Sequence, residues 1–285
     1  MLRTPAVQRF AKTPSEPFQP AHVGLCNASV AVFRDRAPVF EPVFEKETQM
    51  SPKALIIVTS IAEMGKDGKA TGFYWEELAE PYWALIDAGL TVDFVSTAGG
   101  LPPADPTSAK PENRTPAVQR FLDDAAAMAG LAASRPVGSA KAEDYVAIYL
   151  PGGHGTMWDL AQTPAVGELV ALAFDRGAVV GAVCHGGAGL VNATLASGEP
   201  LVKGRRVNSF TDAEEKAAGL ATTVPYLLET ALREKGALFE GNAENFESHA
   251  VQDGNLITGQ NPKSTPAVTK LMMLAVHQVM AAPSA

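Results

Sequence analysis

Residues 181–190 read GAVCHGGAGL and place Cys184, one of two cysteines in the chain, directly before His185. β-branched residues precede this pair and small residues follow it, which is typical of a buried strand that turns into a helix. A lone buried cysteine is most often an inert core residue, and that is the alternative here. A core strand does not need a histidine beside its cysteine, so the pair favours a chemical role for the thiol, with His185 on an exposed loop as the other interpretation.

The expected turn at Cys184 has the features of a nucleophile elbow. In an elbow, a sharp strand-to-helix turn exposes the reactive atom and the helix N-terminus supplies backbone N–H donors. The partial positive charge at that end of the helix favours the thiolate, which is the nucleophilic form of cysteine. The sequence therefore predicts a reactive Cys184 thiolate.

A second glycine-rich stretch, PGGHG at 151–155, also follows an expected strand. Its glycines let backbone N–H groups approach an oxyanion closely. Gly153 and His154 are the expected oxyanion and substrate-binding groups, together with the amide of His185 and the neighbouring Gly186. An ordinary tight turn is the alternative, because Pro and Gly form such turns in many proteins.

A metal site is not expected. His154 is the residue that would suggest one, but His22, His249 and His277 have no ligand spacing with it. No metal and no other cofactor are predicted.

The elements that must position these residues alternate from residue 53 onward. ALIIVTS is typical of a buried strand, FYWEELAEPYWALIDAG of a helix closed by Gly89, and LTVDFVST of a second strand, which together form a βαβ unit. Further strands are expected at YVAIYLPGG, GAVVGAV, RRVNSF and NLITG, with helices near 164–175, 186–196, 213–219, 225–235 and 264–281. The alternation predicts an α/β fold in which helices sandwich a parallel sheet, with the site at the carboxyl ends of the strands.

Two segments interrupt the alternation. Residues 100–143 contain several prolines and then an alanine-rich helix, and they are a candidate cap over the strand ends. Residues 1–49 are rich in proline and lack periodicity, so we expect a poorly ordered extension before an α/β domain over 50–285. A targeting peptide is the alternative for 1–49, although the prolines argue against an amphipathic helix.

Composition excludes several classes of partner. With 285 residues, 46% of them hydrophobic and 19% charged, the chain has the composition of a soluble globular protein. It has neither an apolar run long enough to span a bilayer nor the apolar core of a secretory signal, so a cytoplasmic location is expected. The net charge of -8 argues against nucleic acid or an anionic membrane as a partner. Cys26 and Cys184 have different surroundings, which favours a free thiol over a disulfide.

A series of motifs resembles the ThiJ/PfpI superfamily, within the flavodoxin-like, class I glutamine amidotransferase-like fold. The motifs are TGFYWEELAEPYWAL, VDFVSTAGGLPPADPTS, LPGGHGTMWDL, VVGAVCHGGAGLVN, NSFTDAEE, VPYLLE and LITGQNPKS. The resemblance covers about residues 53–282 and is strongest to the glutathione-independent glyoxalase III-like, heat-shock-chaperone-like branch. It implies Cys184 as the nucleophile, His185 as its partner base, Glu77 as the acid that faces the thiol, and Glu215 as the carboxylate that orients the histidine. Members of the family often form homodimers, although the sequence itself does not indicate an oligomeric state.

The residues around Glu77 support that assignment. Glu77 stands four residues before Pro81, which lacks the N–H that would bond the Glu77 carbonyl, so we expect the helix to bend there. Apolar neighbours would partly bury the carboxyl and raise its pKa, so that it could carry a proton. Glu76 and Glu80 are expected to face solvent instead. The sequence alone ranks Glu77 only slightly above these two neighbours.

The assignment of Glu215 has a simpler alternative. Asp212, Glu214 and Glu215 are also what the charged first turn of a helix contains. Both interpretations remain open at the level of the sequence.

Three functions compete for this sequence. In the favoured one, Cys184 adds to a 2-oxoaldehyde such as methylglyoxal, Glu77 moves protons through an enediol, and hydrolysis releases a 2-hydroxy acid such as D-lactate. Such a glyoxalase III-like lyase, of the D-lactate dehydratase type, needs neither glutathione nor a redox cofactor. The second function is a stress chaperone or thiol redox sensor with an exposed apolar patch. The third is a glutamine amidotransferase or other cysteine hydrolase; amidotransferases carry a downstream His-Pro-Glu arrangement, where this chain has Ser-His-Ala at 248–250.

Overall fold

The computed structural model describes residues 51–281. The expected extension over 1–49 and Cys26 therefore lie outside the described residues. The central sheet has seven strands, in the order β10 (Ala250–Asp253), β11 (Leu256–Gly259), β7 (Val179–Val183), β6 (Ala147–Leu150), β1 (Lys53–Val58), β4 (Thr91–Ser96) and β5 (Arg135–Pro136). Its neighbouring strands run parallel, except that β10 is antiparallel to β11. The predicted α/β class with a mostly parallel sheet is confirmed.

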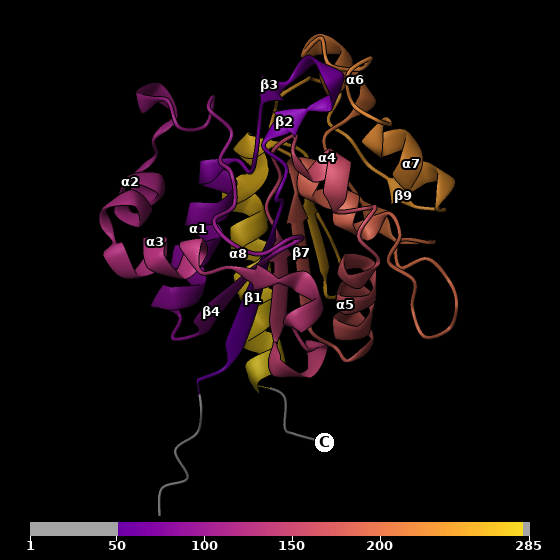
Figure 1. The fold of residues 1–285 in the computed structure, drawn as a ribbon. Coiled ribbons are helices and arrows are strands. Elements are labelled where there is room, and N and C mark those ends of the chain that lie inside the picture. The colour runs from indigo at the N-terminus through magenta and orange to yellow at the C-terminus, as the bar shows by residue number, and fades with distance from the viewer. Residues whose placement is uncertain (1–50, 282–285) are drawn as a thin grey trace, which may run out of the picture. The chain divides into compact units, whose positions relative to one another are not determined.

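Helices cover both faces of this sheet (Figure 1). Helices α1 (Trp75–Asp87) and α8 (Thr265–Ala281) pack together on one face, and α5 (Pro164–Asp175) packs on β6 and β7 from the other. The remaining helices are α2 (Pro116–Asp123), α3 (Ala125–Ala132), α4 (Thr156–Asp159), α6 (Asp212–Ala217) and α7 (Leu228–Glu234). No helix within residues 51–281 is long and apolar enough to cross a membrane.

Strand β1 shows how the sequence fills a core on each face of the sheet. Leu55 and Ile57 belong to the core cluster that includes α5, whereas Ile56 and Val58 belong to the cluster that includes α1 and α8. All four side chains are fully buried. A parallel strand covered on both faces is apolar throughout, and this is why ALIIV does not alternate with polar residues.

The sequence Thr-Pro-Ala-Val marks the start of several helices. Thr115 is the N-cap of α2 and its hydroxyl accepts a hydrogen bond from Val118 N, with Pro116 at the first helical position. Thr163 and Pro164 begin α5 in the same positions. A threonine cap followed by proline is favoured at helix starts because the missing proline N–H has no intrahelical partner there in any case.

Two expected elements differ from the structure. The helix expected over 186–196 is instead a 3-10 helix over Cys184–Leu190, because its glycines have low helix propensity and Gly186 lies against the Leu150 carbonyl, only 2.1 Å from where a Cβ would be. The strand expected at RRVNSF is reduced to β8 (Arg206–Val207), which pairs with β9 (Leu238–Phe239) outside the central sheet. A further small sheet joins β2 (Glu63–Met64) and β3 (Lys69–Ala70), and the other 3-10 helices are Gly65–Asp67, Pro111–Asn113, Val137–Ser139, Ala142–Asp144 and Pro262–Ser264.

The segment over 100–143, which we considered as a cap, passes around the edge of the sheet: it contributes the edge strand β5, and its 3-10 helix Val137–Ser139 contacts α5 on the face opposite to α1. Its helix α2 packs against α1, where Trp83 Nε1 donates a hydrogen bond to the Ala117 carbonyl at 3.2 Å. The Arg120 guanidinium lies 3.7 Å from the centroid of the Trp83 ring. Helix α3 packs against β4. Of this segment, Asp105 and Thr107 line the cavity described below.

Candidate active site

The site forms where the neighbouring strands β6 and β7 end. Because the two strands are parallel, the loop 151–155 after β6 lies beside Cys184 after β7. Two hydrogen bonds join this loop to the start of α1: Tyr74 N donates to the Gly152 carbonyl at 3.0 Å, and Gly152 N donates to Glu77 Oε2 at 2.8 Å. Helix α6 adds Glu215 from a distant part of the chain.

Cys184 occupies a strained turn. Its φ of 55° lies in the left-handed region, which is rare for residues other than glycine and occurs preferentially at functional sites. The side chain lines the cavity although Cys184 is only 4% exposed, and its sulfur receives backbone hydrogen bonds from His185 and Gly153. The turn therefore presents the thiol to the cavity, as the elbow motif predicts.

His185 connects the thiol to a carboxylate. Its Nδ1 lies 3.3 Å from Cys184 Sγ, and its Nε2 lies 2.8 Å from Glu215 Oε2. If Nε2 carries the hydrogen that Glu215 accepts, Nδ1 keeps a lone pair that faces the thiol. Burial, together with the nearby His154, lowers the pKa of His185 to about 4. A neutral imidazole at physiological pH is ready to accept the thiol proton.

Glu215 accepts hydrogen bonds from two histidines. His154 Nε2 lies 3.0 Å from Glu215 Oε1, and the centroids of the His154 and His185 rings are 4.0 Å apart. Burial alone would raise the pKa of Glu215, but the hydrogen bonds from both imidazoles outweigh it and hold that pKa at about 2. Glu215 is thus ionised at neutral pH and forms a hydrogen bond with His185 Nε2.

Glu77 lies next to the thiol in a different environment. Its side chain is fully buried in the first turn of α1, and burial raises its pKa to about 8 even though Cys184 and the Gly152 amide both lower it. Its Oε1 has no hydrogen-bond partner among the described residues. At neutral pH this carboxyl is protonated and can donate a proton beside Cys184.

The expected stabilisation of the thiolate by a helix N-terminus is wrong. Burial and the neighbouring Glu77 raise the pKa of Cys184 well above its usual value, despite the two amides that lower it. The element that begins at Cys184 is a glycine-rich, seven-residue 3-10 helix rather than an α-helix with a full dipole. The free thiol is therefore protonated and needs a base, which His185 supplies.

The three residues expected to bind an oxyanion, Gly153, His154 and Gly186, lie in different surroundings. Gly153 has φ 102° and donates its amide to the Cys184 sulfur, as its expected role as an N–H donor requires. Gly186 lies close to the carbonyl of Leu150 at the end of β6. For His154 the ring matters, because its side chain bonds Glu215. The Thr156 hydroxyl braces the loop through hydrogen bonds to the carbonyls of Gly153 and His185, each at 2.8 Å.

The neighbours of Glu77 differ from the expectation of solvated acids. Glu76 and Glu80 are half-buried, and burial raises the pKa of each. Helix α1 runs through Pro81 to Asp87 without ending. Of the three glutamates on this helix, Glu77 is the one that is fully buried beside the thiol.

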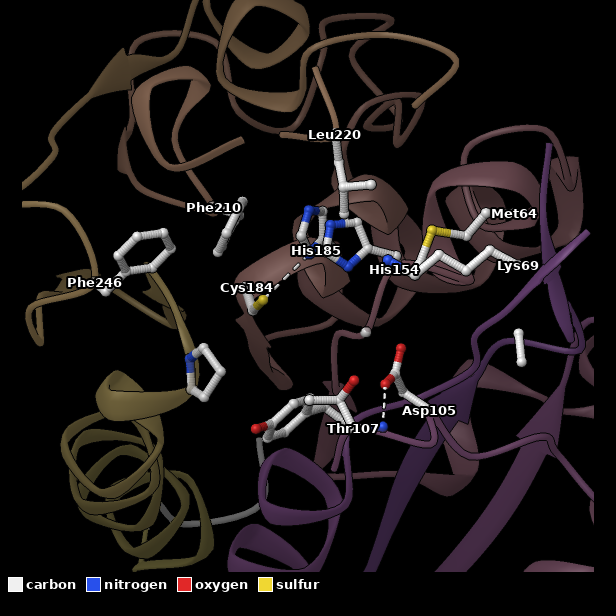
Figure 2. Close-up of a pocket in the computed structure, with 14 residues that line it drawn as sticks. Met64, Lys69, Asp105, Thr107, His154, Cys184, His185, Phe210, Leu220 and Phe246 are labelled. Carbon is white, nitrogen blue, oxygen red and sulfur yellow. Dashed lines mark hydrogen bonds between the residues drawn. The ribbon is translucent and has the colours of Figure 1, made fainter. Parts of the chain in front are cut away.

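A cavity of about 240 Å³ opens over Cys184 (Figure 2). It is lined by Met64, Lys69, Ala70, Tyr74, Asp105, Thr107, Gly153, His154, Cys184, His185, Phe210, Leu220, Phe246 and Pro262. Sequence reasoning missed Tyr74, Phe210 and Phe246 as lining residues. Tyr74 and Phe210 stand inside the motifs FYWEE and NSF. The available signal was an aromatic residue close to the motif acid for Tyr74 and at the end of an expected strand for Phe210. Nothing in the sequence around Phe246 indicates its place.

Two histidines and one carboxylate meet in the site. The ligand atoms of His154, His185 and Glu215 lie within 4.8 Å of one another, a spacing that a metal ion can use. The fold places His154 beside His185, which the spacing of the histidines in the sequence does not indicate. Both Nε2 atoms lie at hydrogen-bond distance from Glu215 oxygens, so two hydrogen bonds account for the arrangement.

The chain is similar to known proteins over most of its length. The model of the DJ-1/PfpI family matches residues 70–274. A glutathione-independent glyoxalase of Saccharomyces cerevisiae is 29% identical over 233 residues, covering 75% of this chain and 94% of that protein. The crystal structure of glyoxalase III from Candida albicans matches with a TM-score of 0.73 and 26% identity, covering 79% of this chain and 97% of that one. The Rapid Encystment Protein of Francisella tularensis matches with a TM-score of 0.75 and 33% identity, covering 79% and 99%.

Proposed function

The chain belongs to the DJ-1/PfpI family, and we propose that it is a glyoxalase III-like enzyme that converts 2-oxoaldehydes such as methylglyoxal into 2-hydroxy acids without glutathione. One arrangement carries the proposal: the Cys184 thiol lies between His185, whose pKa is lowered by burial, and Glu77, whose pKa is raised by burial, so that a base and an acid flank the sulfur. An internal transfer of hydrogen between two substrate carbons needs one group of each kind. The glyoxalase names of similar proteins in two yeasts support the same chemistry.

The first step forms a bond between sulfur and the aldehyde carbon. His185 Nδ1 takes the thiol proton as Cys184 adds to the aldehyde, and Glu215 stabilises the imidazolium that results. The amides of His185 and Gly153, which face the sulfur, are available to the developing oxyanion. Glu77 protonates that oxygen and becomes a carboxylate, which leaves a hemithioacetal on Cys184.

The second step moves hydrogen between carbons. The Glu77 carboxylate removes the proton from the former aldehyde carbon while the His185 imidazolium protonates the keto oxygen, giving an enediol and a neutral His185. Glu77 then delivers its proton to the former keto carbon and takes the proton of the hydroxyl on the former aldehyde carbon, which leaves Glu77 protonated again. The first carbon is oxidised to a thioester and the second is reduced to an alcohol, so the electrons balance within the substrate. No external oxidant or reductant takes part.

The last step frees the enzyme. Water attacks the thioester with His185 as general base, the carbon–sulfur bond breaks, and the thiol recovers its proton. The sum is addition of one water to the 2-oxoaldehyde, with release of a 2-hydroxy acid. For methylglyoxal the product is lactate, and we propose the D enantiomer.

Lactate release from the purified full chain and methylglyoxal alone tests the proposal. D-lactate should accumulate without glutathione, as measured with an enantiomer-specific lactate dehydrogenase. Cys184→Ala is the control: loss of an essential nucleophile should lower the rate by several orders of magnitude, with an unchanged circular dichroism spectrum. No lactate from the wild type would reject the proposal, and more than about a tenth of wild-type activity in Cys184→Ala would reject the covalent step.

The alternative functions have less support. A thiol that is 4% exposed and has a raised pKa is poorly suited to sensing oxidants, which react with exposed thiolates. Exposed large apolar side chains such as Leu101, Leu172 and Leu274 stand on different elements, and single exposed residues of this kind are ordinary. Suppression of client aggregation by Cys184→Ala, with no lactate formed by the wild type, would favour a chaperone instead.

A further inference from the structure

The cavity has an aromatic side that methylglyoxal does not need. Figure 2 shows Phe210 and Phe246 on one side of Cys184, with Lys69 and Asp105 on the other. The centroids of the two phenylalanine rings are 6.1 Å apart. A volume of about 240 Å³ lies just below the range of about 300–1,000 Å³ for pockets that hold drug-sized ligands. A three-carbon substrate would leave much of that space, and most of that wall, in contact with water.

We propose that this enzyme prefers 2-oxoaldehydes with an apolar substituent larger than methyl, and that Phe246 determines the preference. The inference rests on the proposed function and names the substrate class within it. With the aldehyde carbon on Cys184, an aryl or branched alkyl group on the keto carbon can extend toward Phe246. Lys69 and Asp105 give the opposite side a charged character that would not favour such a group.

Phe246 is held at the cavity against its own backbone preference. Its φ is 63°, in a region that is unfavourable for a bulky residue and that is retained only where surrounding contacts enforce it. Its side chain is 39% exposed, so burial of the ring does not explain why the strain is tolerated. The strained backbone and the partial exposure of Phe246 beside the nucleophile are explained if its ring binds a ligand.

The contact that enforces this conformation comes from a buried carboxylate. Phe246 N donates to Glu214 Oε1 at 2.7 Å, and Glu214 is fully buried. The same carboxylate accepts hydrogen bonds from Gln260 Nε2 at 2.9 Å and Asn261 Nδ2 at 2.8 Å, and its other oxygen accepts from Thr211 N at 3.0 Å. These bonds fix the loop that carries Phe246 to α6, the helix that also carries Glu215.

Phe210 completes the aromatic side but serves the catalytic residues as well. Its ring lies 4.4 Å from that of His185, with 32° between the planes, and Phe210 is 6% exposed. A substitution of Phe210 would therefore alter both the surroundings of the base His185 and the aromatic side of the cavity. Phe246 also lines the aromatic side of the cavity, but its ring does not pack on the His185 ring as that of Phe210 does. Phe246 is therefore the residue to vary.

The test compares kcat/KM for phenylglyoxal and 4-methyl-2-oxopentanal with kcat/KM for methylglyoxal. In the wild type we expect both larger substrates to be favoured by about tenfold or more, since each apolar carbon placed in a pocket changes discrimination by about 10-fold or more. Phe246→Gly removes the ring and accepts the left-handed backbone freely, so the ratio of kcat/KM for the larger substrates to kcat/KM for methylglyoxal should collapse toward one. Phe246→Tyr keeps a ring and should keep the ratio.

Leu274→Ala is the matched control, because Leu274 is an exposed apolar side chain on α8 outside the cavity. It should leave the ratio unchanged. An unchanged ratio in Phe246→Gly, or a wild type that uses methylglyoxal as well as the larger substrates, would overturn this inference alone. A wild type that turns over none of the three substrates would instead reject the proposed function.

Inhibition by simple aldehydes separates binding from reactivity. Aldehydes without a keto group add to the thiol but have no neighbouring carbonyl to reduce, so they act as reversible inhibitors. We expect 3-methylbutanal to inhibit the wild type at lower concentration than acetaldehyde, and Phe246→Gly to remove that difference. Equal inhibition by both aldehydes in the wild type would contradict a role for Phe246 in binding.

Discussion

Glu77 and Glu215 stand at the two ends of one chain of contacts, Glu77–Cys184–His185–Glu215, and their pKa values move in opposite directions. Burial raises the pKa of Glu77 to about 8, whereas hydrogen bonds from two histidines outweigh burial and hold Glu215 at about 2. Burial does not separate them, since the two residues are 0% and 3% exposed. The difference is the number of N–H donors that face each carboxyl. One residue type thus supplies a proton donor on one side of the thiol and a fixed anion on the other.

The largest effect is expected when the proton donor is removed. Glu77→Gln keeps the size of the side chain but cannot exchange a proton, so kcat should fall by about 10² to 10⁴. Thiol addition can still proceed, so methylglyoxal should remain on Cys184 as an adduct visible by intact-protein mass after brief exposure. Cys184→Ala should show no adduct. Normal turnover by Glu77→Gln would show that the raised pKa has no catalytic purpose.

Loss of the fixed anion should have a smaller effect. Glu215→Gln offers one acceptor oxygen to two imidazoles and cannot stabilise the His185 imidazolium, so kcat should fall on the order of 10². In contrast to Glu77→Gln, no adduct should accumulate, because the impaired step is deprotonation of the thiol. Alkylation of Cys184 by iodoacetamide should slow in parallel. An adduct that persists in Glu215→Gln would place the two carboxylates in the same role.

The opposite pKa shifts also predict the pH dependence of kcat/KM. His185, with a pKa of about 4, must be neutral to take the thiol proton, so activity should rise as pH rises through about 4. Glu77, with a pKa of about 8, must be protonated to donate, so activity should fall as pH rises through about 8. Activity should drop about tenfold one pH unit beyond each limit. The residual activity of Glu77→Gln should lack the alkaline fall, and an alkaline limb that remains there would assign it to another group.

Substitution of His154 should affect Glu215 and His185 but not Glu77. His154→Asn is too short to maintain the bond to Glu215 Oε1, and it removes a group that lowers the pKa of His185. We expect kcat to fall by less than about tenfold and the acid limb of the pH profile to move above 4. A purely structural role would lower activity without moving that limb.

The smallest effects are expected from the other acids of α1. Glu76→Gln and Glu80→Gln should behave nearly as the wild type in kcat, because neither side chain lines the cavity or contacts Cys184. These variants match Glu77→Gln in chemistry and helix. A strong loss in either one would mean that a different carboxyl serves the thiol.

The elements of this fold were predictable where a single pattern decides them. Apolar runs that are buried on both faces identified β1, β6 and β7, and Gly89, with φ 85°, ends α1 as expected. The pairing of Cys184 with a strand-to-helix turn also follows from local sequence. The 3-10 helix did not, because it depends on the close approach of Gly186 to the Leu150 carbonyl on another strand.

The sequence indicates which residues are candidates for the site, but it does not indicate their electrostatics. The apolar neighbours of Glu77 predicted that its carboxyl is buried and that its pKa is therefore raised. The raised pKa of Cys184 depends on burial and on the nearby Glu77 of α1, and the low pKa of Glu215 depends in part on the hydrogen bond from the His154 side chain. Such through-space contacts between distant loops leave no periodic signal in sequence.

The site is assembled from positions 77, 153, 184 and 215, and this spacing has a consequence for biosynthesis. A ribosome adds about 5–20 residues per second, so Glu77 emerges several seconds before β7 and α6 can join it. Parallel pairing between distant strands forms slowly, because long loops must close first. No nascent chain that ends before residue 215 holds the complete set of contacts. Most of the chain must therefore be synthesised before Cys184 gains its full set of contacts. A half-folded nascent chain does not carry the activated thiol.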